Sequence, residues 1–152
     1  MTSALDDPQR YGWRICRAPY AALDGEGARR FGGRWNSPGV PCVYLADSPA
    51  LAALAVRVHL DLPAALIPED FVLVQVALEA LPTAIVAAMP ADSRTVGDDW
   101  LRDCSTPLLS VPSALVPVSR NLLLNPAHPA APSAREVARA PFRFDARLWR
   151  SG

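Results

Sequence analysis

The stretch FGGRWNSPGVPCVYL, residues 31–45, places a loop rich in glycine and proline directly before a short apolar strand. Gly32 and Gly33 let a backbone pass close to a ligand. The planar guanidinium of Arg34 can hold a phosphate or a carboxylate with two hydrogen bonds. A turn carrying a solvated arginine is the simpler alternative, and these residues alone do not choose between the two.

Outward from this loop, the sequence predicts a chain of many short strands and few helices. Strands are expected at residues 13–16, 41–45, 71–78, 107–118 and 121–126, and the tail PFRFDARLW, residues 141–149, is a candidate last strand. The clearest strand is FVLVQVAL, residues 71–78, because valines recur at every second position. Residues 24–39 are expected to form a loop with one helical turn at 28–30.

The clearest helix is SPALAALAVRVHL, residues 48–60, in which Ser48 is a good N-cap and Pro49 suits the first helical position. One apolar face is expected from the 3/4 spacing of Leu51, Leu54, Ala55 and Val58. GDDWLRD, residues 97–103, predicts a helix start or a turn. This order of elements favours an α+β domain over a doubly wound parallel sheet.

Length and composition predict a single domain over residues 1–152, with 51% hydrophobic residues to build a core. Basic and acidic residues number 15 each, so broad electrostatic capture of nucleic acid is disfavoured. Three scattered cysteines are typical of reduced thiols in the cytosol. The start resembles no signal peptide and no apolar run approaches ~20 residues, so a cytoplasmic protein without membrane contact is expected.

Several familiar chemistries lack their motifs. Two histidines and no CxxC do not favour a zinc site, so no metal is expected. There is no P-loop, and GEGARR, residues 25–30, has Arg30 where a dinucleotide fingerprint needs its third glycine. The remaining candidates are Arg14 in an apolar strand, Arg34, Tyr44 after the loop, and Ser113 after a proline. Taken singly, each has an ordinary structural explanation as a surface arginine, a core tyrosine or a satisfied serine.

Taken together, the motifs resemble the RES domain. The resemblance rests on WRICRAPY, on GGRWNSPG followed by VYLADSPALAAL, on GDDWL, on VPSALVPVSRNLLLNP and on PFRFDARLW, and it runs from about Tyr11 to Trp149. It implies an ADP-ribosyltransferase-like fold of the diphtheria-toxin type, with a mixed sheet and flanking helices. It also implies the toxin of a bacterial toxin–antitoxin pair, partnered by an Xre-type antitoxin that carries the DNA binding.

The same resemblance implies an enzyme that consumes NAD and passes ADP-ribose to phosphate, to water or to a protein. Carried onto this chain, Arg14 and Arg34 would hold the pyrophosphate and Tyr44 would stack on nicotinamide. Ser113 would position the ribose or the nicotinamide amide. Which acceptor is used cannot be read from these residues.

One position departs from the family pattern. The family glutamate is expected on the helix of residues 48–60, at the position occupied by Ala55. A carboxylate there would stabilise the oxocarbenium-like state of nicotinamide–ribose cleavage, and losing such a group typically costs on the order of 10²–10³ in rate. Either the alanine was placed deliberately, because the active toxin kills its host, or this homologue has lost or re-routed catalysis. A non-catalytic module that binds NAD or an antitoxin is the alternative function, and a purely structural domain is a third.

Overall fold

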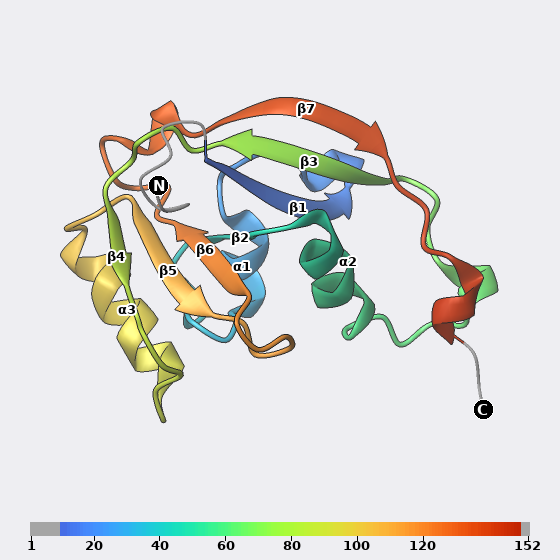
Figure 1. Cartoon of the computed structure of the whole chain (residues 1–152), viewed down its shortest axis with the longest axis horizontal. Helices are drawn as coiled ribbons and strands as arrows, with labels where there is room; N and C mark the ends of the chain where they lie inside the picture. The colour runs from blue at the N-terminus through green and yellow to red at the C-terminus, as the bar shows by residue number, and fades with distance from the viewer. Residues whose placement is uncertain (1–9, 150–152) are drawn as a thin grey trace.

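Seven strands form one mixed sheet in the computed structural model, which describes residues 10–149. The sheet order is β4-β5-β6-β2-β1-β3-β7 (Figure 1). The strands are β1 (Tyr11–Arg17), β2 (Val43–Ala46), β3 (Phe71–Ala77), β4 (Thr83–Ile85), β5 (Leu108–Pro112), β6 (Arg120–Leu124) and β7 (Arg135–Pro141). Strands β4 and β5 run parallel, and the other neighbours are antiparallel. The prediction of an α+β class is confirmed.

The sheet is joined only loosely at its middle. Strands β1 and β3 pair from Tyr11↔Ala77 to Arg17↔Phe71, whereas β1 meets β2 at the single register pair Trp13↔Ala46. Figure 1 shows β1, β3 and β7 running across the view and β4, β5 and β6 running steeply down its left side, with β2 between the two groups. The main core cluster draws its side chains from both groups, including residues of β2, β3, β5 and β6. Apolar burial therefore holds the two halves together where backbone pairing is sparse.

Helix α2 (Pro49–Arg57) begins as expected, because the Ser48 hydroxyl accepts a hydrogen bond from the Leu51 amide at 3.1 Å. The predicted apolar face is wrong in part. Leu51 is buried, but Leu54 and Val58 are 40% and 52% exposed. The helix instead buries Ala52 and packs Ala53 and Val56 against Ile15 and Phe71, so its contact face is turned away from Leu54.

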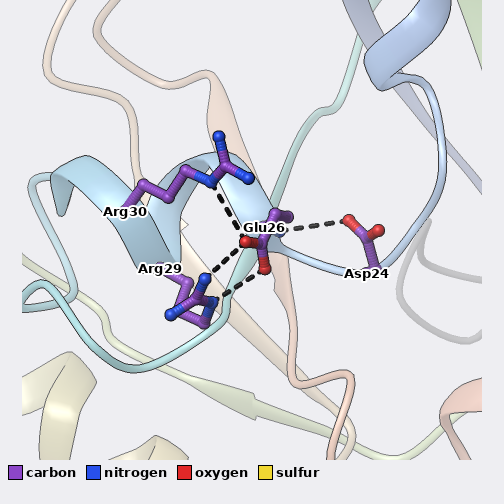
Figure 2. Close-up of polar contacts among 4 residues, drawn as sticks. All are labelled: Asp24, Glu26, Arg29 and Arg30. Carbon is purple, nitrogen blue, oxygen red and sulfur yellow. Dashed lines mark hydrogen bonds and ion pairs between the residues drawn. The ribbon is translucent and has the colours of Figure 1, made fainter.

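The short helix α1 (Glu26–Phe31) lies within the segment predicted as a loop and contains the helical turn expected at residues 28–30. Its first residue, Glu26, accepts hydrogen bonds from Arg29 at 2.8 Å and from Arg30 at 3.1 Å (Figure 2). The Asp24 carboxylate accepts from the Glu26 amide at 3.1 Å. Hydrogen bonds from Arg29 and then Arg30 lower the pKa of Glu26 to about 2. These hydrogen bonds stabilise α1 directly before the glycine-rich loop.

Three other expectations need correction. Helix α3 (Ser93–Asp103) is a full helix capped by Asp92, whose carboxylate accepts from the Thr95 amide at 3.1 Å. Of residues 107–118, only Leu108–Pro112 form a strand, because the chain turns at Ser113 to enter β6. The tail 141–149 is not a strand beyond Pro141, which ends β7. Phe144 packs edge-on against both Phe71 and Phe142, and Ala146–Trp149 form a 3₁₀ turn.

Strand β7 was not predicted, since all seven of its residues are exposed at the sheet edge and no apolar alternation marks it. Strand β4 was missed because it is three residues long and follows Pro82. Among residues 10–149, no helix combines the length and the apolar character needed to cross a membrane.

Candidate functional site

The glycine-rich loop closes around the buried side chain of Asn36. Its Nδ2 donates to the carbonyl oxygens of Ala28 at 2.9 Å, Val40 at 3.0 Å and Ser37 at 3.2 Å. The Gly33 amide donates to the Asn36 carbonyl at 2.9 Å, which makes a tight turn. Gly32 takes a φ of 72°, a left-handed conformation that favours glycine. These hydrogen bonds fix the backbone of the loop, while the Arg34 side chain on it is exposed.

Tyr44 on β2 reaches into the same loop. Its hydroxyl donates to Asn36 Oδ1 at 2.5 Å and accepts from the Trp35 amide at 3.1 Å. A Cβ atom added to Gly33 would lie 2.6 Å from this hydroxyl oxygen, so only glycine fits between the tyrosine and the surface. Burial, followed by the nearby Cys42, raises the pKa of Tyr44 above its ordinary value. The Tyr44 hydroxyl is therefore neutral at physiological pH and holds the loop through these two hydrogen bonds.

Helix α3 clamps the loop from the other side. Asp98 accepts hydrogen bonds from the Ser37 amide at 2.8 Å and the Ser37 hydroxyl at 2.6 Å. Trp35 is buried against Trp100 and Leu101 of the helix. This packing is so close that a Cβ atom on Gly97 would stand 1.7 Å from the Trp35 carbonyl oxygen. The loop and the helix therefore form one unit.

An open cleft of about 620 Å³ lies on this unit, lined by Gly32, Gly33, Arg34, His59, Ser93 and Arg94. The backbone of Arg34 is held by the Ser93 hydroxyl, which donates to its carbonyl oxygen at 2.8 Å. Arg94 donates from Nε and Nη2 to the Gly33 carbonyl at 3.3 and 3.2 Å. The cleft wall therefore carries two guanidinium groups from two separate elements, which suits an anionic ligand.

Ala55 lies half-buried on α2, one helical turn before His59. The helix on which the resemblance expects a glutamate ends at Arg57, two residues before His59, and none of its own residues lines the cleft. Nothing acidic stands at position 55, since alanine offers only a methyl group. Asp47, just before the helix, is engaged elsewhere, because its carboxylate accepts from the Arg120 amide at 2.8 Å.

Arg14 is not brought beside Tyr44. Its strand neighbours Trp13 and Ile15 pack with α2, whereas Cys16, on the face of Arg14, packs against the main core cluster. Tyr44 faces the other way from Val43 and Leu45, which belong to that main cluster. Arg14 and Tyr44 therefore lie on opposite faces of the sheet.

The Arg14 guanidinium donates to the carbonyl oxygens of Ala22 at 3.2 Å and Tyr20 at 3.3 Å. In this structure it ties down the segment after β1.

Ser113 also lies outside the cleft lining. Its hydroxyl accepts from the amides of Leu115 and Val116, each at 3.1 Å, and so caps the turn between β5 and β6. Val116 in that turn packs against the cluster that contains α2.

Sequence reasoning missed Asn36, Arg94, Asp98 and His59 as parts of this region. Asn36 could have been noticed, because an asparagine before Ser-Pro-Gly commonly bonds local backbone. Arg94 and Asp98 could not, since only the docking of α3 brings them to the loop. Within residues 10–149, no group of three histidine, cysteine, aspartate or glutamate side chains could hold a metal ion.

Comparison with known proteins gives consistent matches over nearly the whole chain. The model of the RES domain family matches residues 12–145. "Toxin Res" of Pseudomonas putida is 41% identical over 150 residues, covering 90% of this chain and 98% of that protein. The "Prs ADP-ribosylating toxin" of a Sphingobium species is 39% identical over 154 residues, covering 91% of this chain and 96% of its own length.

A shorter match is to "NAD(+) phosphorylase MbcT" of Mycobacterium tuberculosis, 62% identical over 37 residues, which is 24% of this chain and 20% of that protein. The fold is similar to a chain in the crystal structure of the M. tuberculosis MbcT–MbcA toxin–antitoxin complex. The TM-score is 0.72 at 21% sequence identity, covering 92% of this chain and 90% of that one. The family model and the full-length relatives together show that the chain belongs to the RES domain family.

Proposed function

We propose that this chain is the toxin of a bacterial toxin–antitoxin pair and that its cleft binds NAD for cleavage at the nicotinamide–ribose bond. The observation that carries this is the cleft itself, which is lined by Arg34 of the hydrogen-bonded loop and by His59, two residues after the end of α2. Relatives named as an ADP-ribosylating toxin and an NAD(+) phosphorylase support the reaction class. Such a reaction places the protein in the cytoplasm, where NAD is available.

Within this proposal, Arg34 binds the diphosphate through its planar donors. Tyr44 holds the loop through its hydroxyl. By family resemblance its ring would stack on nicotinamide, and it too is not among the cleft-lining residues. Arg14 and Ser113 stay candidates from the family resemblance alone, since both are engaged with backbone groups away from the cleft lining. Arg14→Ala and Ser113→Ala, each assayed for NAD affinity, test whether either contacts the dinucleotide.

The chemical weakness of the site is at position 55. Nicotinamide departure leaves positive charge on the ribose, and a preorganised carboxylate stabilises it as carboxylates do in glycoside cleavage. The Ala55 methyl group cannot supply that charge, so this chain should bind NAD yet turn it over slowly or not at all. Phosphate, water or a protein remains open as the acceptor of ADP-ribose.

Expression in bacteria tests the toxin proposal. The Ala55→Glu variant should deplete cellular NAD and arrest growth, and the present chain should not. Ala50→Glu is a matched control, because it adds the same charge to the exposed first turn of the same helix. Mass analysis of the products then identifies the acceptor as free ADP-ribose, its phosphate or a modified protein. Growth and NAD levels unaffected by Ala55→Glu would contradict the proposal.

An antitoxin partner follows from the same proposal. The solved neighbour is in a toxin–antitoxin complex, and a cleft with two arginines suits a partner segment that carries acidic residues or ends in a carboxylate. By family resemblance the partner is of the Xre type and would hold any DNA contact. Ala55 also favours a second candidate, a module that binds NAD or the antitoxin without turnover. Tight antitoxin binding with no NAD affinity would favour that candidate.

A further inference from the structure

We infer that Arg94 on α3 is a second phosphate-binding side chain of the cleft and that it acts together with Arg34. This inference rests on the proposed function and names how the cleft recognises its ligand. The chemistry recognised is a phosphate group, either in the diphosphate of a dinucleotide or as a free phosphate that accepts ADP-ribose.

The two arginines are held differently but meet at the same cleft. Arg94 is fixed over the loop by its two bonds to the Gly33 carbonyl oxygen, and its Nη1 has no partner among residues 10–149. The Arg34 side chain makes no hydrogen bond or ion pair within that same part of the chain. One guanidinium is therefore pre-positioned and the other is free to close on a ligand, an arrangement that lowers the ordering cost of binding.

Neither cleft arginine forms an ion pair within residues 10–149, although the Arg94 charge, after the hydrogen bonds from Thr95, helps to lower the pKa of Asp92. The carboxylate nearest in sequence is Asp92, directly before Ser93. It is occupied by the Thr95 hydroxyl at 2.7 Å and the Thr95 amide at 3.1 Å, and no ion pair links it to either cleft arginine in the described residues. His59 also lines the cleft. A cleft of about 620 Å³ is larger than a phosphate ion needs and lies within the range of small-molecule sites.

Arg94 can also take the place of Arg14 as the second arginine that contacts the pyrophosphate. The family resemblance assigns two arginines to the pyrophosphate, but Arg14 is on the other sheet face and bound to carbonyl oxygens. Arg94 lines the cleft with Arg34 and reaches it from the first turn of α3, where backbone amides lack helical partners. The second guanidinium of the site therefore comes from α3 in this structure.

Calorimetric titration of the present chain tests this with three probes: ADP-ribose, ADP and inorganic phosphate. Arg94→Gln should weaken ADP-ribose binding roughly ten- to hundredfold, as expected for the loss of a charge-assisted hydrogen bond. Arg94→Lys should retain part of the affinity, because it keeps the charge. Arg102→Gln is the matched control: it lies on the same helix roughly 12 Å further along, exposed and paired with Asp99, and should bind like the parent.

The outcomes separate this inference from the proposed function. Binding of ADP-ribose but not of phosphate assigns the dinucleotide, and binding of phosphate in the presence of ADP-ribose assigns the acceptor. Unchanged ADP-ribose affinity in a folded Arg94→Gln variant, with binding lost in Arg34→Gln, would overturn the inference and leave the proposed function standing. If Arg94→Gln loses ADP-ribose affinity as expected but the Ala55→Glu variant releases no nicotinamide, the phosphate-binding role of Arg94 stands. The proposed NAD-cleaving function is then rejected.

Discussion

At the scale of the residue, Asn36 is the centre of the loop. Its side chain contacts three carbonyl oxygens and the Tyr44 hydroxyl while fully buried. Asn36→Ala leaves these groups without partners, so we expect a loss on the order of 3 kcal/mol in the free energy of unfolding. Chemical denaturation measures this. Pro38→Ala, an exposed change in the same loop, should stay within about 1 kcal/mol; equal effects of the two would show that Asn36 does not organise the loop.

Two groups beside the loop, the buried Cys42 thiol and the half-buried Tyr44 hydroxyl, predict how stability responds to high pH. Burial raises the pKa of Cys42 from 9.0 to about 12, and burial also raises the pKa of Tyr44. A pKa raised in the folded state favours the neutral form, so this stability is complete below pH 9.0 and declines as pH rises toward 12. The denaturation midpoint should fall across this window, and Cys42→Ala or Tyr44→Phe should each flatten the profile. If the denaturation midpoint of both variants fell with pH as steeply as that of the parent, neither group would have a raised pKa in the folded protein.

At the scale of the element, the docking of α3 on the loop depends on one missing side chain. Gly97→Ala forces a Cβ atom against the Trp35 carbonyl oxygen, so the helix must move off the loop and the cleft should lose its shape. We expect a destabilisation of about 2 kcal/mol or more and weaker NAD binding. Gly27→Ala is the control, because a Cβ on α1 at that site meets no atom within 4 Å. It should be neutral or stabilising by up to about 1 kcal/mol.

Local chemistry explains which elements could be predicted from sequence. Strand β3 and the start of α2 were confirmed, because alternating valines and a Ser-Pro cap are local signals. The exposed edge strand β7 and the orientation of α2 were not predictable in this way. They depend on what packs against them, and the contact face of α2 became apparent only with Ile15 and Phe71 in place.

At the scale of the whole molecule, the sequence and the family resemblance singled out the loop, Arg34, Tyr44 and position 55 as candidates, and of these residues Arg34 lines the cleft. The sequence could not predict the cleft, because that needs α3 to bring Ser93 and Arg94 to the loop from some 60 residues away. It also could not show that Arg14 and Tyr44 face opposite sides of the sheet, which depends on the register Trp13↔Ala46. The expected reaction with NAD came from the family resemblance, whereas the residues that surround Arg34 in the cleft could be identified only from the fold.

We propose that the cleft is an NAD-cleaving site disabled at position 55. The most direct measurement is nicotinamide release from NAD by the purified Ala55→Glu variant, the present chain and the Ala50→Glu control. We predict that Ala55→Glu raises the rate by on the order of 10²–10³ and that Ala50→Glu matches the present chain. Equal rates for all three, with phosphate and cell extract supplied as acceptors, would contradict the account.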